Sequence, residues 1–158
     1  MKNQFYFIVS FLLFFSACTG VDSRVKKSFK NTENTIYLKN LTPSGYEVMD
    51  AGSQLEYALE DEIGRSMFIV TRESPKYVLK YKVLRYKKGS RLGRFSSFGL
   101  LKSTQGQLEV KAALYEDGDQ VGAWTIDAWI KGGFTGGDPN TLFQQAANKI
   151  MEHLRGNF

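Results

Sequence analysis

Alternating apolar and polar residues predict most of the strands in this chain. Ile36 and Leu38 alternate with Tyr37 and Lys39, and the segment stops before a turn rich in Pro, Ser and Gly. A short apolar run at 67–71 and a longer alternating segment at 77–87 predict two more strands. The last two strands are predicted to place one set of apolar residues on a shared buried face: Leu108, Val110, Ala112, Leu114, Trp124, Ile126, Ala128 and Ile130.

The turn between these last two strands admits two registers. A two-residue Asp-Gly turn sets Lys111 opposite Trp124. A three-residue loop at 116–118, with Gly118 in the left-handed conformation, instead sets Val110 opposite Trp124. We prefer the second register.

Two segments with apolar residues at three- and four-residue spacing predict helices. The first ends near Gly64 and can be capped by Asp50 or Ser53. The second follows a glycine-rich stretch, with Asp138 as the expected N-cap and Pro139 as the first helical residue. The order of elements is strand, helix, four strands, helix. It predicts a two-layer α+β domain, in which two amphipathic helices pack on one face of a mostly antiparallel sheet.

The first 33 residues fall outside this domain pattern. Residues 1–17 contain a lysine, an apolar run and a small-residue end, which is typical of a secretory signal peptide. The apolar run is too short for a hydrocarbon core that needs about 20 helical residues, which disfavours a permanent membrane-spanning helix. Residues 18–33 are polar and basic and are predicted to form a flexible tether. Residues 34–158 are predicted to form a single globular domain.

The end of the signal segment carries the most specific motif. Cys18 directly follows Ser16 and Ala17 and is the only cysteine, so no intramolecular disulfide can form. This arrangement resembles the lipobox of bacterial lipoproteins, and the resemblance implies cleavage before Cys18 and acylation of its sulfur. The alternatives are ordinary secretory cleavage, which leaves a free thiol, and an uncleaved anchor. Thr19 stands where an aspartate retains enterobacterial lipoproteins in the inner membrane, so the resemblance implies the outer membrane. The expected location is the periplasmic side of that membrane, with the inner membrane and the cell surface as alternatives.

Charge and composition narrow the function classes. The formal charge is +5, and it becomes +4 without residues 1–17, because Lys2 is the one charged residue in that segment. Such a small excess does not predict nucleic-acid binding. The chain has one histidine, and its one cysteine is the predicted acylation site. It therefore offers neither a catalytic triad nor a set of zinc ligands, and no enzymatic activity, metal or cofactor is expected. His153 is expected in the last helical turn, where an imidazolium complements the helix dipole. A carboxylate-based hydrolase acting on cell-wall material remains an alternative.

One long connection mixes cations with apolar side chains. Arginine and lysine can meet phosphates while phenylalanine and leucine meet acyl chains, so this loop is a candidate site for anionic lipid or a partner. The alternative is a plain connection whose apolar residues fold back on the core. The candidate residues of this loop are Lys87, Lys88, Arg91, Arg94, Phe95, Phe98 and Lys102.

The sheet face away from the helices is the second candidate surface. Its mixture of charges and aromatic rings suits a partner surface or a merely solvated face, and the sequence does not choose between them. The residues expected there are Lys80, Lys82, Glu109, Lys111, Thr125, Asp127, Tyr37, Tyr115 and Trp129.

Residues 35–41, 55–63 and 76–83, the hairpin at 116–118 and the lipobox together resemble the lipopolysaccharide-assembly lipoprotein family. A related group of uncharacterised Gram-negative lipoproteins has glycine-rich stretches between its third and fourth strands and before its last helix, as this chain does. The first resemblance implies a lipoprotein beside an outer-membrane β-barrel that helps to deliver lipopolysaccharide. The insertion at 88–106 departs from that family. The resulting hypothesis is a non-enzymatic binding or assembly factor, with a hydrolase or a structural lipoprotein without a ligand as alternatives.

Overall fold

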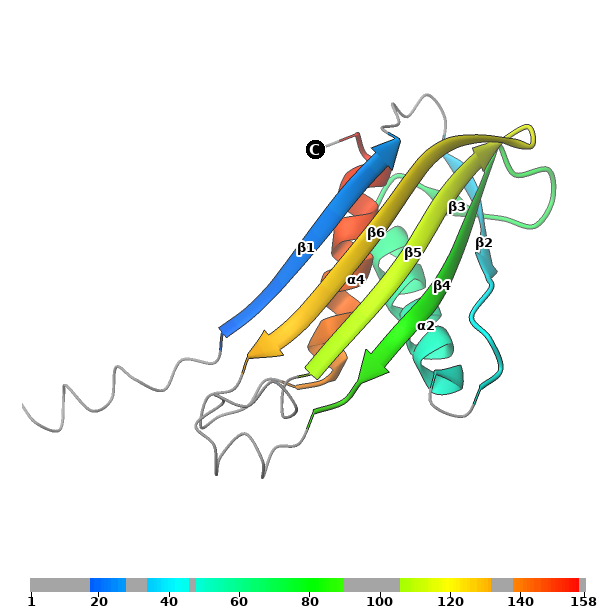
Figure 1. The fold of residues 1–158 in the computed structure, drawn as a ribbon. Coiled ribbons are helices and arrows are strands. Elements are labelled where there is room, and N and C mark those ends of the chain that lie inside the picture. The colour runs from blue at the N-terminus through cyan, green and yellow to red at the C-terminus, as the bar shows by residue number, and fades with distance from the viewer. Residues whose placement is uncertain (1–17, 28–33, 46–47, 90–105, 132–137, 157–158) are drawn as a thin grey trace, which may run out of the picture.

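The computed structural model describes residues 18–27, 34–45, 48–89, 106–131 and 138–156. Within them, six strands form one sheet in the order β1-β6-β5-β4-β2-β3, and two helices lie on the same side of it (Figure 1). The predicted two-layer α+β architecture is confirmed. The elements are β1 (Cys18–Lys27), β2 (Thr35–Asn40), α2 (Met49–Gly64), β3 (Ile69–Val70), β4 (Tyr77–Lys87), β5 (Gly106–Glu116), β6 (Asp119–Lys131) and α4 (Asn140–Leu154).

The sheet is antiparallel across β4, β5, β6 and β1, while β2 runs parallel to both of its neighbours, β3 and β4. Parallel strands need a crossover connection, and α2 supplies it by returning the chain from β2 to β3. In the described part of the chain, neither helix is long and apolar enough to cross a membrane.

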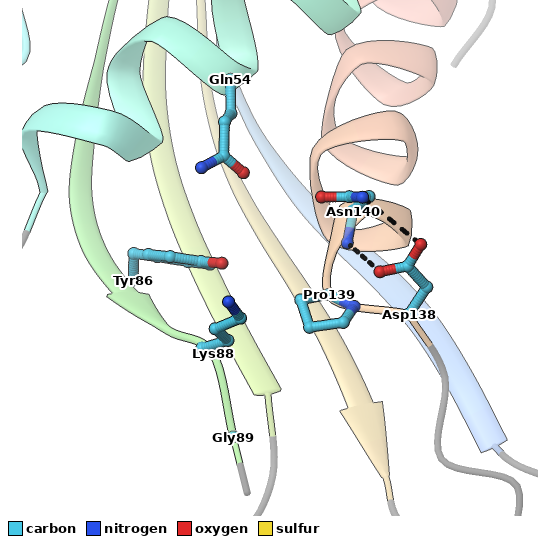
Figure 2. Close-up of a pocket in the computed structure, with 7 residues that line it drawn as sticks. All are labelled: Gln54, Tyr86, Lys88, Gly89, Asp138, Pro139 and Asn140. Carbon is cyan, nitrogen blue, oxygen red and sulfur yellow. Dashed lines mark hydrogen bonds between the residues drawn. The ribbon is translucent and has the colours of Figure 1, made fainter. Parts of the chain in front are cut away.

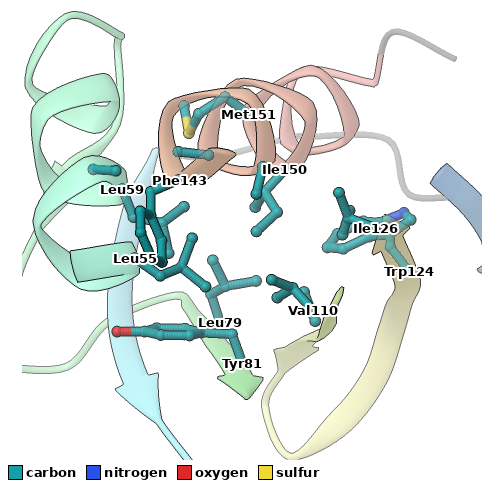
Figure 3. Close-up of a cluster of buried hydrophobic side chains, with 14 of the residues drawn as sticks. Leu55, Leu59, Leu79, Tyr81, Val110, Trp124, Ile126, Phe143, Ile150 and Met151 are labelled. Carbon is teal, nitrogen blue, oxygen red and sulfur yellow. The ribbon is translucent and has the colours of Figure 1, made fainter. Parts of the chain in front are cut away.

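The core lies between the sheet and the two helices (Figure 3). Leu55 and Leu59 of α2 and Ile150 of α4 are fully buried there against Leu79 and Trp124 of the sheet. Complete burial of a large aliphatic side chain contributes about 1.5–3 kcal/mol, so this layer supplies most of the stability. The predicted buried face of β5 and β6 is confirmed: each of its eight apolar residues is buried.

The predicted tether is wrong for Cys18–Lys27, which forms strand β1. The whole strand pairs antiparallel with β6, from Cys18 opposite Lys131 to Lys27 opposite Ala123. Its composition is polar because it is an edge strand that depends on backbone pairing, with Val21 packed against the core. The rest of the predicted tether, 28–33, lies outside the described residues, as does the predicted signal peptide at 1–17.

The β5–β6 hairpin differs from both predicted registers. The turn has two residues, Asp117 (φ 50°) and Gly118 (φ 94°), because both adopt the positive φ that this tight turn requires. A bulge on β6 at Val121 then adds one residue, which places Trp124 opposite Ala112. The preferred three-residue loop is therefore wrong. The extra residue explains how a two-residue turn still keeps Trp124 on the buried face.

The helix starts were predicted with mixed success. Helix α2 begins at Met49 with no side-chain cap, so the predicted caps Asp50 and Ser53 are wrong. At α4 the Oδ1 atom of Asp138 accepts a hydrogen bond from the backbone N–H of Asn140 (3.1 Å), which confirms the predicted capping role. Pro139 has helical dihedral angles, although the helix is assigned from the next residue.

Candidate functional site

The strand register brings the ends of several separate segments to one end of the sheet, which we call the Cys18 end. Cys18 pairs with the last residue of β6. Gly106, the first residue of β5, pairs with Ile130, the residue before the last one of β6. Lys87 ends β4 and pairs with the second residue of β5. Both ends of the long basic connection therefore lie at the same end of the sheet as the predicted lipidation site (Figure 1).

The predicted site residues are only partly within the described chain. Cys18 is the first residue of β1. Lys87 is exposed at the end of β4, and Lys88 follows it at the edge of a cavity. The other candidates, Arg91, Arg94, Phe95, Phe98 and Lys102, lie outside the described residues, and so does the glycine-rich segment 132–137.

A cavity of about 460 Å³ lies at the Cys18 end, between the end of β4 and the first turns of both helices (Figure 2). Tyr86 forms one wall, and its ring packs at a tilt on Phe143 with 5.1 Å between the ring centres. Burial raises the pKa of the Tyr86 phenol, and the negative charge of Asp138 raises it further. Both effects favour the neutral phenol. The cavity is lined by Gln54, Tyr86, Lys88, Gly89, Asp138, Pro139 and Asn140.

The lining of this cavity includes one carboxylate, which is already hydrogen-bonded, and one lysine. The carboxylate of Asp138 accepts hydrogen bonds from the backbone and the side-chain amide of Asn140, at 3.1 and 3.3 Å, and so occupies the start of α4 (Figure 2). A carboxylate already placed there satisfies the positive end of the helix dipole. Lys88 is the lining cation. Among the described residues, no cluster of His, Cys, Asp and Glu could hold a metal ion.

The open face of the sheet carries a second depression, of about 420 Å³. The prediction that lysines gather on this face is confirmed, because Lys80, Lys82 and Lys111 all line it. Sequence alternation was sufficient to find them, since each follows or precedes a buried residue. Lys26 also lines the depression and was missed, because its strand was predicted to be a tether.

His153 has a different role from the predicted one. It does lie in the last turn of α4, but it is only 1% exposed and stacks on Trp124 with 5.3 Å between the rings. Its Nε2 atom is 3.0 Å from the hydroxyl oxygen of Ser23 in β1. Burial lowers the pKa of His153, and the charge of Lys149 lowers it further. Both effects favour the neutral imidazole over the predicted imidazolium, and the ring joins α4 to β1 and β6.

Fold and surfaces together define a two-layer α+β domain with one helix-covered face and one open, charged face. No family model and no curated protein matches the sequence. Among solved structures the chain is similar to a PelC dodecamer from Paraburkholderia phytofirmans, with 16% identity and a TM-score of 0.45 over 89% of this chain and 100% of that chain.

Two further neighbours have slightly higher TM-scores. A minor lipoprotein from Acinetobacter baumannii has 14% identity and a TM-score of 0.49 over 77% of this chain and 90% of that chain. A DUF330 protein from Xanthomonas campestris has 15% identity and a TM-score of 0.49, over 84% and 90%. The neighbours thus include a lipoprotein. At these identities and TM-scores they assign no ligand, partner or assembly to this chain.

Proposed function

We propose that this chain is an envelope lipoprotein, anchored through an acylated Cys18, that acts without catalysis as a binding or assembly factor at the outer membrane. The observation that supports this function is the position of Cys18 as the first residue of β1, paired with the last residue of β6. An anchor attached there leaves no free tether between the lipid and the sheet. The Cys18 end of the sheet then faces the bilayer.

The same end carries basic side chains that suit this orientation. Lys87 lies in β4, separated from β1 by β5 and β6, and three strand spacings correspond to about 14 Å. A lysine close to an anionic membrane surface contributes about 1 kcal/mol to binding. The loop that continues from Lys88 adds arginines and phenylalanines, which suit phosphate groups and acyl chains respectively. Lipopolysaccharide or an outer-membrane β-barrel is the proposed partner.

Replacement of the anchor residue tests the proposed membrane location. In a Gram-negative host, Cys18→Ala should move the protein from the membrane fraction to the soluble periplasmic fraction, because the remaining surface contacts are weak and reversible. Cell fractionation with immunoblotting measures this change. Thr19→Ala is the matched control, since it alters the next residue and keeps the thiol. Continued membrane retention of Cys18→Ala would contradict the proposed anchor, as would a mass spectrum of the native protein showing a free thiol.

The loop is tested separately with lipid vesicles that contain phosphatidylglycerol. Arg91→Ala with Arg94→Ala should weaken sedimentation with these vesicles, because two charge contacts to phosphates are lost. Arg72→Ala is the control: Arg72 is an exposed arginine in the β3–β4 connection, at the opposite end of the sheet. Equal binding by the double variant and the parent protein would refute the membrane contact of the loop.

A further inference from the structure

The depression on the open sheet face is a surface distinct from the Cys18 end. Its polar lining comes from three strands and the β1 edge, and we call it the lysine groove, formed by Lys26, Lys80, Lys82, Lys111, Tyr115 and Thr125. Its volume is about 420 Å³, within the size range of sites that bind small molecules. It lies level with Arg24, which is six residues along β1 from Cys18, or about 20 Å.

The central feature of the groove is a pair of like charges. Lys82 on β4 lies directly opposite Lys111 on β5, and both are exposed. Like charges at directly opposed positions of an antiparallel pair destabilise the sheet. Lys80 lies two residues before Lys82 on the same face, with its Nζ atom 3.7 Å from the centre of the Tyr115 ring. The aromatic ring thus holds a third ammonium group on the same face of the sheet.

Two acidic residues of this face are engaged in ion pairs, and a third, Asp22 of β1, lies opposite Asp127. Glu109 forms an ion pair with Arg85 (3.6 Å), and Asp127 forms one with Arg24 (3.6 Å). Both carboxylates lie one row nearer to the Cys18 end than Lys111 and Thr125. Among the ion pairs formed between described residues, none involves a lysine of the groove. The groove therefore concentrates positive charge that the fold itself leaves uncompensated.

We propose that the lysine groove binds a small, multiply phosphorylated molecule. Ammonium groups bind phosphate as compact point charges, and four of them around one depression match a ligand with several phosphates better than a single carboxylate. The Tyr115 hydroxyl already donates to Oε1 of Gln120 (3.5 Å) and Thr125 is buried, so the lysines provide the main ligand contacts. The depression is open to solvent, so a small soluble ligand can reach its lysines directly. Ligand binding would offset the repulsion between Lys82 and Lys111.

Isothermal titration of the purified full chain with inorganic tripolyphosphate tests this proposal. We expect one saturable site. The double variant Lys82→Gln with Lys111→Gln should bind about a hundredfold more weakly, since each lost phosphate contact corresponds to about tenfold in affinity. Lys149→Gln is the control: it removes one lysine charge from α4, on the other layer, and should bind like the parent.

Thermal unfolding separates a loss of binding from a loss of folding. Because the double variant removes a repulsive pair, its melting temperature should equal or exceed that of the parent. Three results would overturn the proposal: no saturable binding of tripolyphosphate, equal affinity in the double variant and the parent, or binding of the groove to phosphatidylglycerol vesicles without binding to the soluble phosphate. The last result would identify the groove as a bilayer contact.

Discussion

The two faces of the sheet are built from the same strands yet have opposite properties. In β4, Leu79 and Tyr81 are buried beneath the helices, whereas Lys80 and Lys82, which alternate with them, lie on the open face. A step of one residue along the strand exchanges an apolar interior for a charged surface. Stability is therefore concentrated on the covered face, and the open face is free to carry charges that weaken the fold but suit a ligand.

The largest expected effect comes from breaking the covered face. Leu79→Ala should lower the free energy of unfolding by about 2–5 kcal/mol, because it leaves a cavity among fully buried neighbours. On the open face, Lys82→Ala should change it by less than about 0.5 kcal/mol. Chemical denaturation followed by circular dichroism measures both. Similar losses at the two positions would show that the faces are not energetically distinct.

A smaller effect is expected from a close contact on the open face. A Cβ atom added to Gly20 in β1 would lie 2.2 Å from the indole ring of Trp129 in β6, so Gly20→Ala must displace that ring. Such overpacking costs about 1–3 kcal/mol. Gly64→Ala, at the end of α2, is the control because an added Cβ there meets nothing within 4 Å. A Gly20→Ala protein as stable as the parent would mean that β1 does not pack on β6 as described.

The smallest of the three effects is a pH dependence on the covered face. The folded pKa of His153 is lowered, whereas the unfolded chain has the usual value of about 6.5. Below that pH the unfolded state takes up a proton that the folded state excludes, so stability should fall as the pH drops from about 7 toward 5. Carboxylates also change the stability of both proteins with pH. The parent and His153→Gln are therefore compared with each other, by denaturation at several pH values. The variant should have the flatter profile, and identical profiles would contradict the buried neutral imidazole.

The sequence predicted the faces of the sheet better than its edges. Alternation identified the buried face of β5 and β6 and the lysines opposite it, because burial acts residue by residue along a strand. The polar strand β1 escaped prediction, since an edge strand depends on backbone pairing with β6 more than on burial. Gly20 leaves room for the ring of Trp129, which lies more than 100 positions away in the sequence. Such a contact leaves no local signal.

The candidate sites show the same limit. The long loop was chosen for its composition, and its arginines remain a prediction. The lysines of the open face could be assigned to one surface, but the opposition of Lys82 and Lys111 could not, because it depends on the β4–β5 register. Likewise, the bulge at Val121 decides which residue faces Trp124, and nothing in the local sequence marks it. The stacking of His153 on Trp124 and its contact with Ser23 depend on how α4 packs over the finished sheet.

The antiparallel pairing of β1 with β6 has a mechanical consequence. A pull on Cys18 acts along the axis of β1, so the force is shared by the whole row of backbone hydrogen bonds instead of opening them one at a time. Under the proposed acylation of Cys18, the lipid would join the sheet directly through β1. The height of the domain above the bilayer and its tilt would then be set by the sheet.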